Sequence, residues 1–182
     1  MKLYTHFMAL LALISFNACS EDENENEMEE IASNTELSVS GEVEGEYKAL
    51  GSYFEHFDAD SELYVNSFEF MDQYNPAEST FLIGISRFSQ EDMELTTGLY
   101  PLSTSYLAGG DTNSFGVGVS WWDEERKATI YPEVSNGILR ITQISSERIR
   151  GEIILRMKTS EYDEHQAELN IDGKFNVPRE EF

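Results

Sequence analysis

Alternation of apolar and polar residues with a period of two constrains this chain more than any other feature of its sequence. From Val39 to Tyr53 every odd position is valine, glycine, tyrosine or alanine, whereas the even positions from Ser40 to Lys48 are polar and mostly glutamate. Successive side chains point to opposite faces of a strand, so this pattern is typical of a strand with one buried face. We therefore expect a single strand here, whose glycines mark a bend or the close approach of another backbone, as at the corners of a barrel or sandwich.

The same pattern recurs along the rest of the chain, and helical periodicity is nearly absent. Ser89 could cap one helical turn in the segment that follows it. Many short strands separated by turn residues are typical of an antiparallel sandwich or barrel. We therefore predict an all-β fold, an antiparallel β-sandwich or partly open β-barrel of about eight strands with at most one short helix. The further strands are expected at 63–70, 80–88, 114–122, 127–131, 138–144, 148–158 and 166–171, with turns at 75–76, 109–111, 136–137 and 172–173.

The last two predicted strands form the most clearly patterned hairpin. Odd residues in both strands are mostly apolar and are expected to face the core. A turn near Tyr162 would place Arg156 opposite Glu168. The outer face of the first strand carries four cations, which we interpret as partners of nearby carboxylates rather than as an anion site: Arg148, Arg150, Arg156 and Lys158.

The first 18 residues have the features of a secretory signal peptide. Lys2 and His6 begin it, and an apolar run over 7–16 follows that is too short to span a bilayer as a helix, which needs about 20 residues. Cys19, the only cysteine, comes directly after the small residue Ala18. This arrangement resembles the signal of bacterial lipoproteins. The resemblance implies that Cys19 is lipidated and that the lipid anchors the chain to a membrane.

An acidic run over 20–30 follows the cysteine. It has almost no apolar residue and no cation, so we expect an extended tether. The predicted organisation is a signal peptide over 1–18, a lipidated Cys19 with a disordered acidic tether over 19–36, and an all-β domain over 37–182. Acidic residues in this place resemble the export signal of Bacteroidetes surface lipoproteins. That resemblance implies an outer-membrane lipoprotein exposed at the cell surface.

Two further segments carry a second resemblance. Residues 137–151 together with 171–178, and residues 97–102 earlier in the chain, resemble small Bacteroidetes lipoprotein domains of unknown function. The resemblance covers about a third of the chain after the signal peptide and implies an all-β domain. It transfers no catalytic residue, because those domains have no assigned activity.

Charge limits the partners of this chain. Loss of residues 1–18 would remove only Lys2, leaving 11 Lys and Arg against 35 Asp and Glu, a net charge of −24. Nucleic acid binding needs basic patches that displace counterions, so we expect no nucleic acid partner. A single cysteine also allows no internal disulfide, and the fold must depend on its apolar core.

No residue pattern indicates catalysis, and we expect no enzyme and no cofactor. Serine nucleophile motifs and phosphate-binding glycine loops are absent. His56 and His165 lie far apart, whereas metal ligands are usually paired at short spacing. Asp58, Asp60 and Glu62 alternate as in a calcium loop, but the glycine and distal glutamate of an EF-hand are missing. We therefore predict no metal site, although calcium binding by a carboxylate cluster stays open.

The best candidate for ligand binding is aromatic. Consecutive residues of a strand face opposite sides, so Trp121 and Trp122 cannot both lie in the core. If Trp121 faces inward, Trp122 faces outward, where it could stack on a sugar ring or on an apolar group of a partner. The alternative is that a loop or a second sheet covers Trp122. The candidate ligand surface is Trp122 with Tyr64, Tyr100 and Tyr106.

Two classes of function follow from these features. The first is a surface-displayed binding module for a glycan, a peptide or an envelope protein. The alternative is a structural or accessory envelope lipoprotein. A barrel that holds a small apolar ligand in its interior is a third hypothesis.

Overall fold

The computed structural model describes residues 34–73, 75, 77–104, 114–124, 127–160 and 166–181. The fold described below is that of the compact unit Ala32–Phe182. Cys19, the predicted signal peptide, the tether up to residue 33 and Tyr106 lie outside the described residues. The described residues form strands and no helix, which confirms the predicted all-β fold class; the segment after Ser89 has no helical turn.

The described residues of this unit form ten strands, and most of them match a predicted strand. Segments rich in valine, isoleucine and aromatic residues favour this conformation because their side chains pack well on a pleated surface. β5 was not predicted, and β1 begins at Thr35 where residue 37 was the expected start of the domain. The strands are β1 (Thr35–Gly41), β2 (Gly45–Asp58), β3 (Leu63–Met71), β4 (Phe81–Ser89), β5 (Gly98–Ser103), β6 (Phe115–Asp123), β7 (Ala128–Ile130), β8 (Glu133–Ile144), β9 (Arg148–Lys158) and β10 (Glu168–Glu181).

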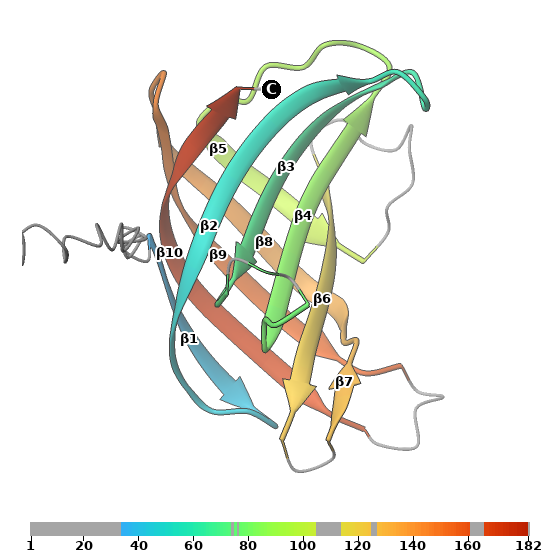
Figure 1. The fold of residues 1–182 in the computed structure, drawn as a ribbon, viewed down its shortest axis with the longest axis vertical. Helices are drawn as coiled ribbons and strands as arrows, with labels where there is room; N and C mark the ends of the chain where they lie inside the picture. Colours follow the sequence, from blue (N-terminus) through green and yellow to red (C-terminus); the bar gives the residue numbers. More distant parts are fainter. Residues whose placement is uncertain are drawn as a thin grey trace, which may run out of the picture. The chain divides into compact units, whose positions relative to one another are not determined.

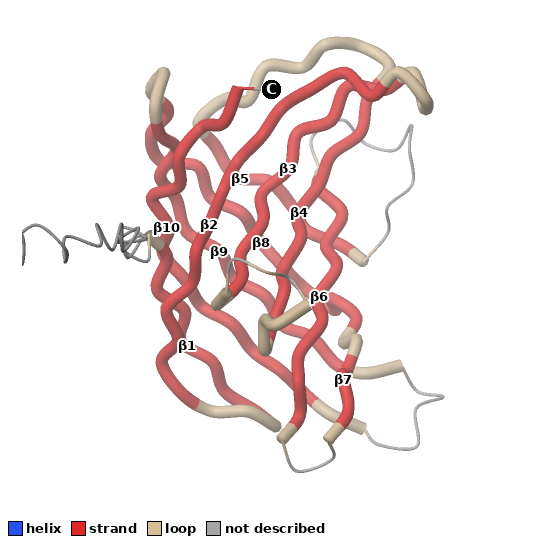
Figure 2. Tube along the Cα trace, viewed as in Figure 1, coloured by secondary structure: helices blue, strands red, loops and turns tan. Residues whose placement is uncertain are grey.

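All ten strands belong to one sheet whose pairings close on themselves. The order is β4-β3-β2-β1-β10-β9-β8-β5-β6, and β6 pairs back to β4, so these strands form a ring to which β7 is added beside β6 (Figure 1). In Figure 2 the strands curve around a common interior, with β2, β3 and β4 on the near side and β8 and β9 behind them. The pairings are antiparallel except for β5 with β6 and β2 with β10.

Aromatic side chains fill the interior of the ring. Phe68 lies at their centre, and its ring centroid is 4.7 Å from that of Tyr53, 5.6 Å from Phe175 and 6.2 Å from Phe115. Inward residues of β9 and β10 are also buried, as the alternation predicted. The fold is therefore supported by burial of apolar area rather than by disulfides.

The prediction of one strand from Val39 to Tyr53 was wrong. β1 and β2 form an antiparallel hairpin instead, with the turn at residues 42–44. Gly41 and Gly45 on either side of this turn have φ values of 116° and 152°, which side chains other than glycine rarely adopt. Inward residues are odd-numbered in both strands, so the alternation shows no break at the turn. The turn could therefore not be recognised from the pattern.

Two predicted turns were also wrong, because glycine has another role at each. Gly137 lies within β8 beside a bulge between Val134 and Asn136. Gly173 lies within β10, where a Cβ atom would come within 2.5 Å of the Leu37 side chain. Both glycines therefore allow close packing inside a continuing strand.

The predicted register of the C-terminal hairpin was wrong by two residues. Arg156 lies opposite Asn170, and Lys158 lies opposite Glu168. A shift of two keeps every side chain on its predicted face, so the inward and outward sets are unchanged.

Candidate functional site

The two tryptophans of β6 lie on opposite faces of the sheet. Trp121 is 2% exposed and belongs to the core, whereas Trp122 points outward and is half-buried. The expectation from the alternation, that Trp122 leaves the core if Trp121 enters it, is confirmed. Trp122 is neither fully covered nor fully open to solvent.

Inner aromatic rings stack directly beneath this part of β6. The Trp121 ring lies parallel to Phe81, with centroids 4.7 Å apart and an interplanar angle of 10°. Tyr47 meets Trp121 edge-on at 5.1 Å. Packed aromatic groups of this kind give the outward Trp122 a stiff support.

Hydrogen bonds position the backbone at Trp122. Its N–H donates to the carbonyl of Thr80 at 2.7 Å, and it lies opposite Thr129 of β7. Thr80 is fixed in turn by Asp72, whose carboxylate accepts from the Thr80 N–H at 2.8 Å and from its hydroxyl at 2.5 Å. Trp122 is therefore positioned from both sides, by the entry to β4 and by β7.

Tyr131 is the second aromatic residue at this position, and it was not among the predicted ligand-binding residues. Along β7, Thr129 is exposed and Ile130 is buried, so the alternation places Tyr131 on the same outward face as Thr129. Tyr131 is 70% exposed. Pro132 follows it, which favours extended backbone at Tyr131. An aromatic residue just before a proline at the end of a short strand was the available signal.

Trp122 and Tyr131 line one concave surface, which we call the tryptophan hollow. Its volume is about 540 Å³, which lies within the range of ligand pockets. The rim comes from the turn between β3 and β4, where the Glu78 N–H donates to the Asn75 carbonyl at 2.9 Å. The residues of the tryptophan hollow are Ala77, Glu78, Ser79, Thr80, Ser120, Trp122, Glu124, Thr129 and Tyr131.

Charge around the tryptophan hollow is negative. Among the described residues that line it, Glu78 and Glu124 are the charged ones, and they stand among the hydroxyl groups of serine and threonine. A second hollow, which Trp122 also lines, contains Glu42, Glu44 and Asp123. The surroundings thus combine an aromatic platform, neutral hydroxyls and carboxylate acceptors, and they disfavour anions.

Of the other predicted aromatic residues, the two that the structure describes, Tyr64 and Tyr100, do not join Trp122. Tyr64 lies opposite Ser89 at the far end of β4, about 30 Å along the strand from Thr80. Tyr100 is 6% exposed and donates its hydroxyl to the Thr96 carbonyl at 2.7 Å, so it belongs to the core rather than to a surface.

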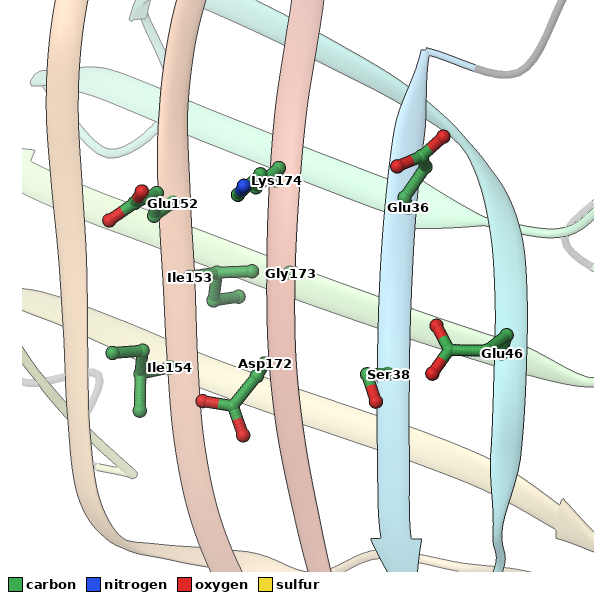
Figure 3. A pocket seen from close by; sticks show the side chains of 9 residues that line it. All are labelled: Glu36, Ser38, Glu46, Glu152, Ile153, Ile154, Asp172, Gly173 and Lys174. Carbon is green, nitrogen blue, oxygen red and sulfur yellow. The ribbon is translucent and has the colours of Figure 1, made fainter.

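Figure 3 shows a separate concave surface, on the outer face of β9, β10, β1 and β2. Glu152, Lys174 and Glu36 lie directly opposite one another on neighbouring strands, so their charges alternate in sign. Glu152 also pairs with Arg140 of β8 at 3.3 Å. Its described lining holds four carboxylates and one lysine, of which Glu152 and Asp172 pair with arginines outside the lining, and none of these lining residues is aromatic.

Two polar groups in the interior have shifted pKa values. Arg87 is 6% exposed and its guanidinium lies 5.0 Å from the centre of the Phe115 ring. Burial lowers the pKa of Arg87. Burial, with the nearby charge of Glu55, raises the pKa of Tyr53, whose hydroxyl donates to Glu55 at 2.9 Å.

The carboxylates weighed as a calcium loop form a turn between β2 and β3. Asp58 accepts from the Ser61 hydroxyl at 2.6 Å and from the Asp60 N–H at 3.1 Å, and these bonds lower the pKa of Asp58. Within the described ranges, no three carboxylate, histidine or cysteine groups come close enough together to hold a metal ion.

Comparison with known protein families, with curated proteins and with solved structures finds no match for this chain. In the part of the chain that the structure describes, no helix has the length and apolar character needed to cross a bilayer.

Proposed function

We propose that this chain is a carbohydrate-binding module whose ligand occupies the tryptophan hollow. The single observation that carries the proposal is the pair Trp122 and Tyr131, half-buried and 70% exposed, in one concave surface. The flat face of a sugar ring packs well on an indole or phenol ring. Serine, threonine and glutamate around the rings offer the hydrogen-bond partners that sugar hydroxyls need.

Charge selects among sugars. Glu78 and Glu124 flank the rings, and the whole chain has a net charge of −23. A uronic acid or a sulfated sugar would bring like charge into this surface, whereas a neutral sugar would only donate hydroxyl hydrogens to the carboxylates. We therefore assign neutral glycans as the ligand class.

We further propose that the domain is held at the cell surface as an outer-membrane lipoprotein. Support comes from the sequence alone, namely the signal-like segment, Cys19 and the acidic run after it. A lipid on Cys19 would anchor the chain without a transmembrane helix. The domain would then present its glycan site outside the cell on an acidic tether.

Contact with an envelope protein is the second candidate, and one observation favours it. Pro101, Ile138 and Ile154 lie directly opposite one another on β5, β8 and β9, and the two isoleucines are 39% and 37% exposed. An exposed apolar row of this kind suits a protein partner. The third hypothesis, an interior site for a small apolar ligand, is not favoured, because aromatic side chains around Phe68 occupy the interior.

The test is an array of neutral and acidic oligosaccharides with the purified chain and Trp122→Ala. We expect binding to neutral glycans and a loss of more than about tenfold in the variant, as for removal of a central aromatic anchor. Leu99→Ala is the matched control, because Leu99 is 61% exposed and lies on β5 away from the tryptophan hollow. Circular dichroism would establish that each variant is folded.

Binding to neutral glycans that survives Trp122→Ala would contradict the proposed site. Absence of binding to every neutral glycan would contradict the proposed function.

A further inference from the structure

The four outward cations of β9 are not alike in their partners. Arg156 pairs with Asp172 at 3.0 Å, and Lys158 lies directly between Glu133 of β8 and Glu168 of β10. For Arg156 and Lys158, the structure agrees with the prediction that nearby carboxylates are the partners of these cations. Arg148 and Arg150 differ, because their partners are neutral.

Asn176 of β10 holds both of these arginines. Its side-chain oxygen accepts from Nε of Arg148 at 2.8 Å and from Nε of Arg150 at 3.3 Å, and its carbonyl accepts from Nη2 of Arg148. Arg150 also donates through Nη1 to the side-chain oxygen of Gln143 at 3.4 Å. Two guanidinium groups thus converge on one amide oxygen, and an amide does not cancel their charge.

Each guanidinium keeps donors for a further acceptor. Arginine has five N–H groups in a planar fork. Among the contacts of the described residues, Nη1 of Arg148 and Nη2 of Arg150 donate to no protein group. Arg150 is exposed and Arg148 is half-buried, so an anion can reach the pair from solvent.

We propose that Arg148 and Arg150, oriented by Asn176, bind a phosphoryl group. Two positive charges match a phosphate dianion, and its tetrahedral oxygens can accept from both forks at once. Binding would also relieve the repulsion between the two like charges. The site lies on β9 and β10, whereas the tryptophan hollow is lined by residues of β6, of β7 and of the turn before β4, so this inference is independent of the proposed function.

The phosphoryl group could belong to a soluble phosphate ester or to a lipid headgroup. The net charge of −23 repels anions at long range, but salt screens this repulsion beyond about 8 Å at physiological ionic strength. We therefore expect phosphate to bind weakly. Detecting such binding needs a measurement that follows the arginine groups directly and reaches saturation.

The test follows the arginine Nε–H signals of the full, isotope-labelled chain by NMR during titration with inorganic phosphate at constant ionic strength. Signals of Arg148 and Arg150 should shift and saturate, while that of Arg140, which pairs with Glu152, should not. Arg150→Gln should weaken binding at least tenfold, and the matched control Arg140→Gln should not.

Asn176→Asp provides a second variant of nearly unchanged shape. Its carboxylate would neutralise the two arginines, so phosphate should no longer shift their signals while the fold is retained. Glucose 6-phosphate and vesicles of phosphatidylglycerol in phosphatidylcholine separate the two sources, and binding of either one supports the site. Shifts that do not saturate, equal shifts at Arg140, or equal affinity for acetate would overturn the proposal.

Discussion

At the scale of single residues, Trp122 and Tyr131 owe their positions to the residues beside them. Trp121 enters the core on Phe81, which turns Trp122 outward, and Ile130 enters the core, which leaves Tyr131 outside. The alternation of β6 was sufficient to predict the first of these. Tyr131 could not be predicted as its neighbour, because the pairing of β6 with β7 depends on a turn whose register the sequence does not specify.

Tyr100 was predicted to lie on the ligand surface, but it is buried. A tyrosine in a strand can lie in the core or on the surface. Its hydroxyl does not prevent burial if a backbone carbonyl nearby accepts its hydrogen bond. Tyr100 finds such an acceptor in the Thr96 carbonyl, only four residues away. Burial of this tyrosine therefore follows from tertiary packing and was not predictable from its sequence neighbours.

The buried hydroxyl of Tyr53 leads to a prediction about alkaline stability. Because the pKa of Tyr53 is raised in the folded state, its neutral form contributes stability that is fully present below the ordinary tyrosine pKa of about 10. Above that pH the unfolded chain loses the proton and the folded chain keeps it, so stability falls by up to about 1.4 kcal/mol for each pH unit.

Urea unfolding of wild type and Tyr53→Phe between pH 7 and pH 11 would measure this effect. The free energies of unfolding should differ by a constant amount below about pH 9 and should converge above about pH 10. Parallel curves over the whole range would show that Tyr53 ionises as easily in the folded protein as in the unfolded one.

At the scale of elements, glycines decide where strands turn and where they continue. Gly41 and Gly45 have positive φ and flank a turn, whereas Gly173 stays in a strand because Leu37 and Ile153 occupy the space of a side chain. Strand existence, type and facing were largely predictable from the alternation. The β1–β2 turn and the ring closure through β4 and β6 were not, because both depend on contacts between residues distant in sequence or on backbone angles.

Gly151 of β9 offers a test of this packing. A Cβ atom there would overlap the Arg140 carbonyl and the Phe175 ring, so Gly151→Ala should lower the free energy of unfolding by about 1–3 kcal/mol. Gly84→Ala is the matched control, because no heavy atom beyond its two chain neighbours lies within 4 Å of its Cβ position. Chemical denaturation would compare the two variants. Equal stabilities would mean that the β8–β9–β10 contact is looser than described.

At the scale of the whole molecule, the dominant property is the excess of acidic residues. The chain has 35 Asp and Glu against 12 Lys and Arg, so self-repulsion opposes the compact state. Some cations lie opposite carboxylates on neighbouring strands, as in the alternating row of Arg140, Glu152, Lys174 and Glu36. Such exposed pairs offset only part of the repulsion.

Salt should therefore stabilise the protein. Raising NaCl from 0.01 to 0.1 M shortens the Debye length from about 30 to about 10 Å, and the midpoint of thermal unfolding should rise by a few degrees. NaBr at equal ionic strength should give a similar rise if screening is the cause. A midpoint that falls with salt would mean that the ion pairs outweigh the repulsion.

The central claim, that Trp122 holds a neutral glycan, can be tested within one molecule because the chain has only two tryptophans. The measurement is a titration of the ¹⁵N-labelled chain with the neutral oligosaccharide that binds best on the array, following the two indole N–H signals by NMR. Trp122→Phe assigns the signals. We predict that the Trp122 signal shifts and saturates while that of Trp121, 2% exposed in the core, stays in place. Equal shifts of both signals, or no shift of Trp122, would contradict the account.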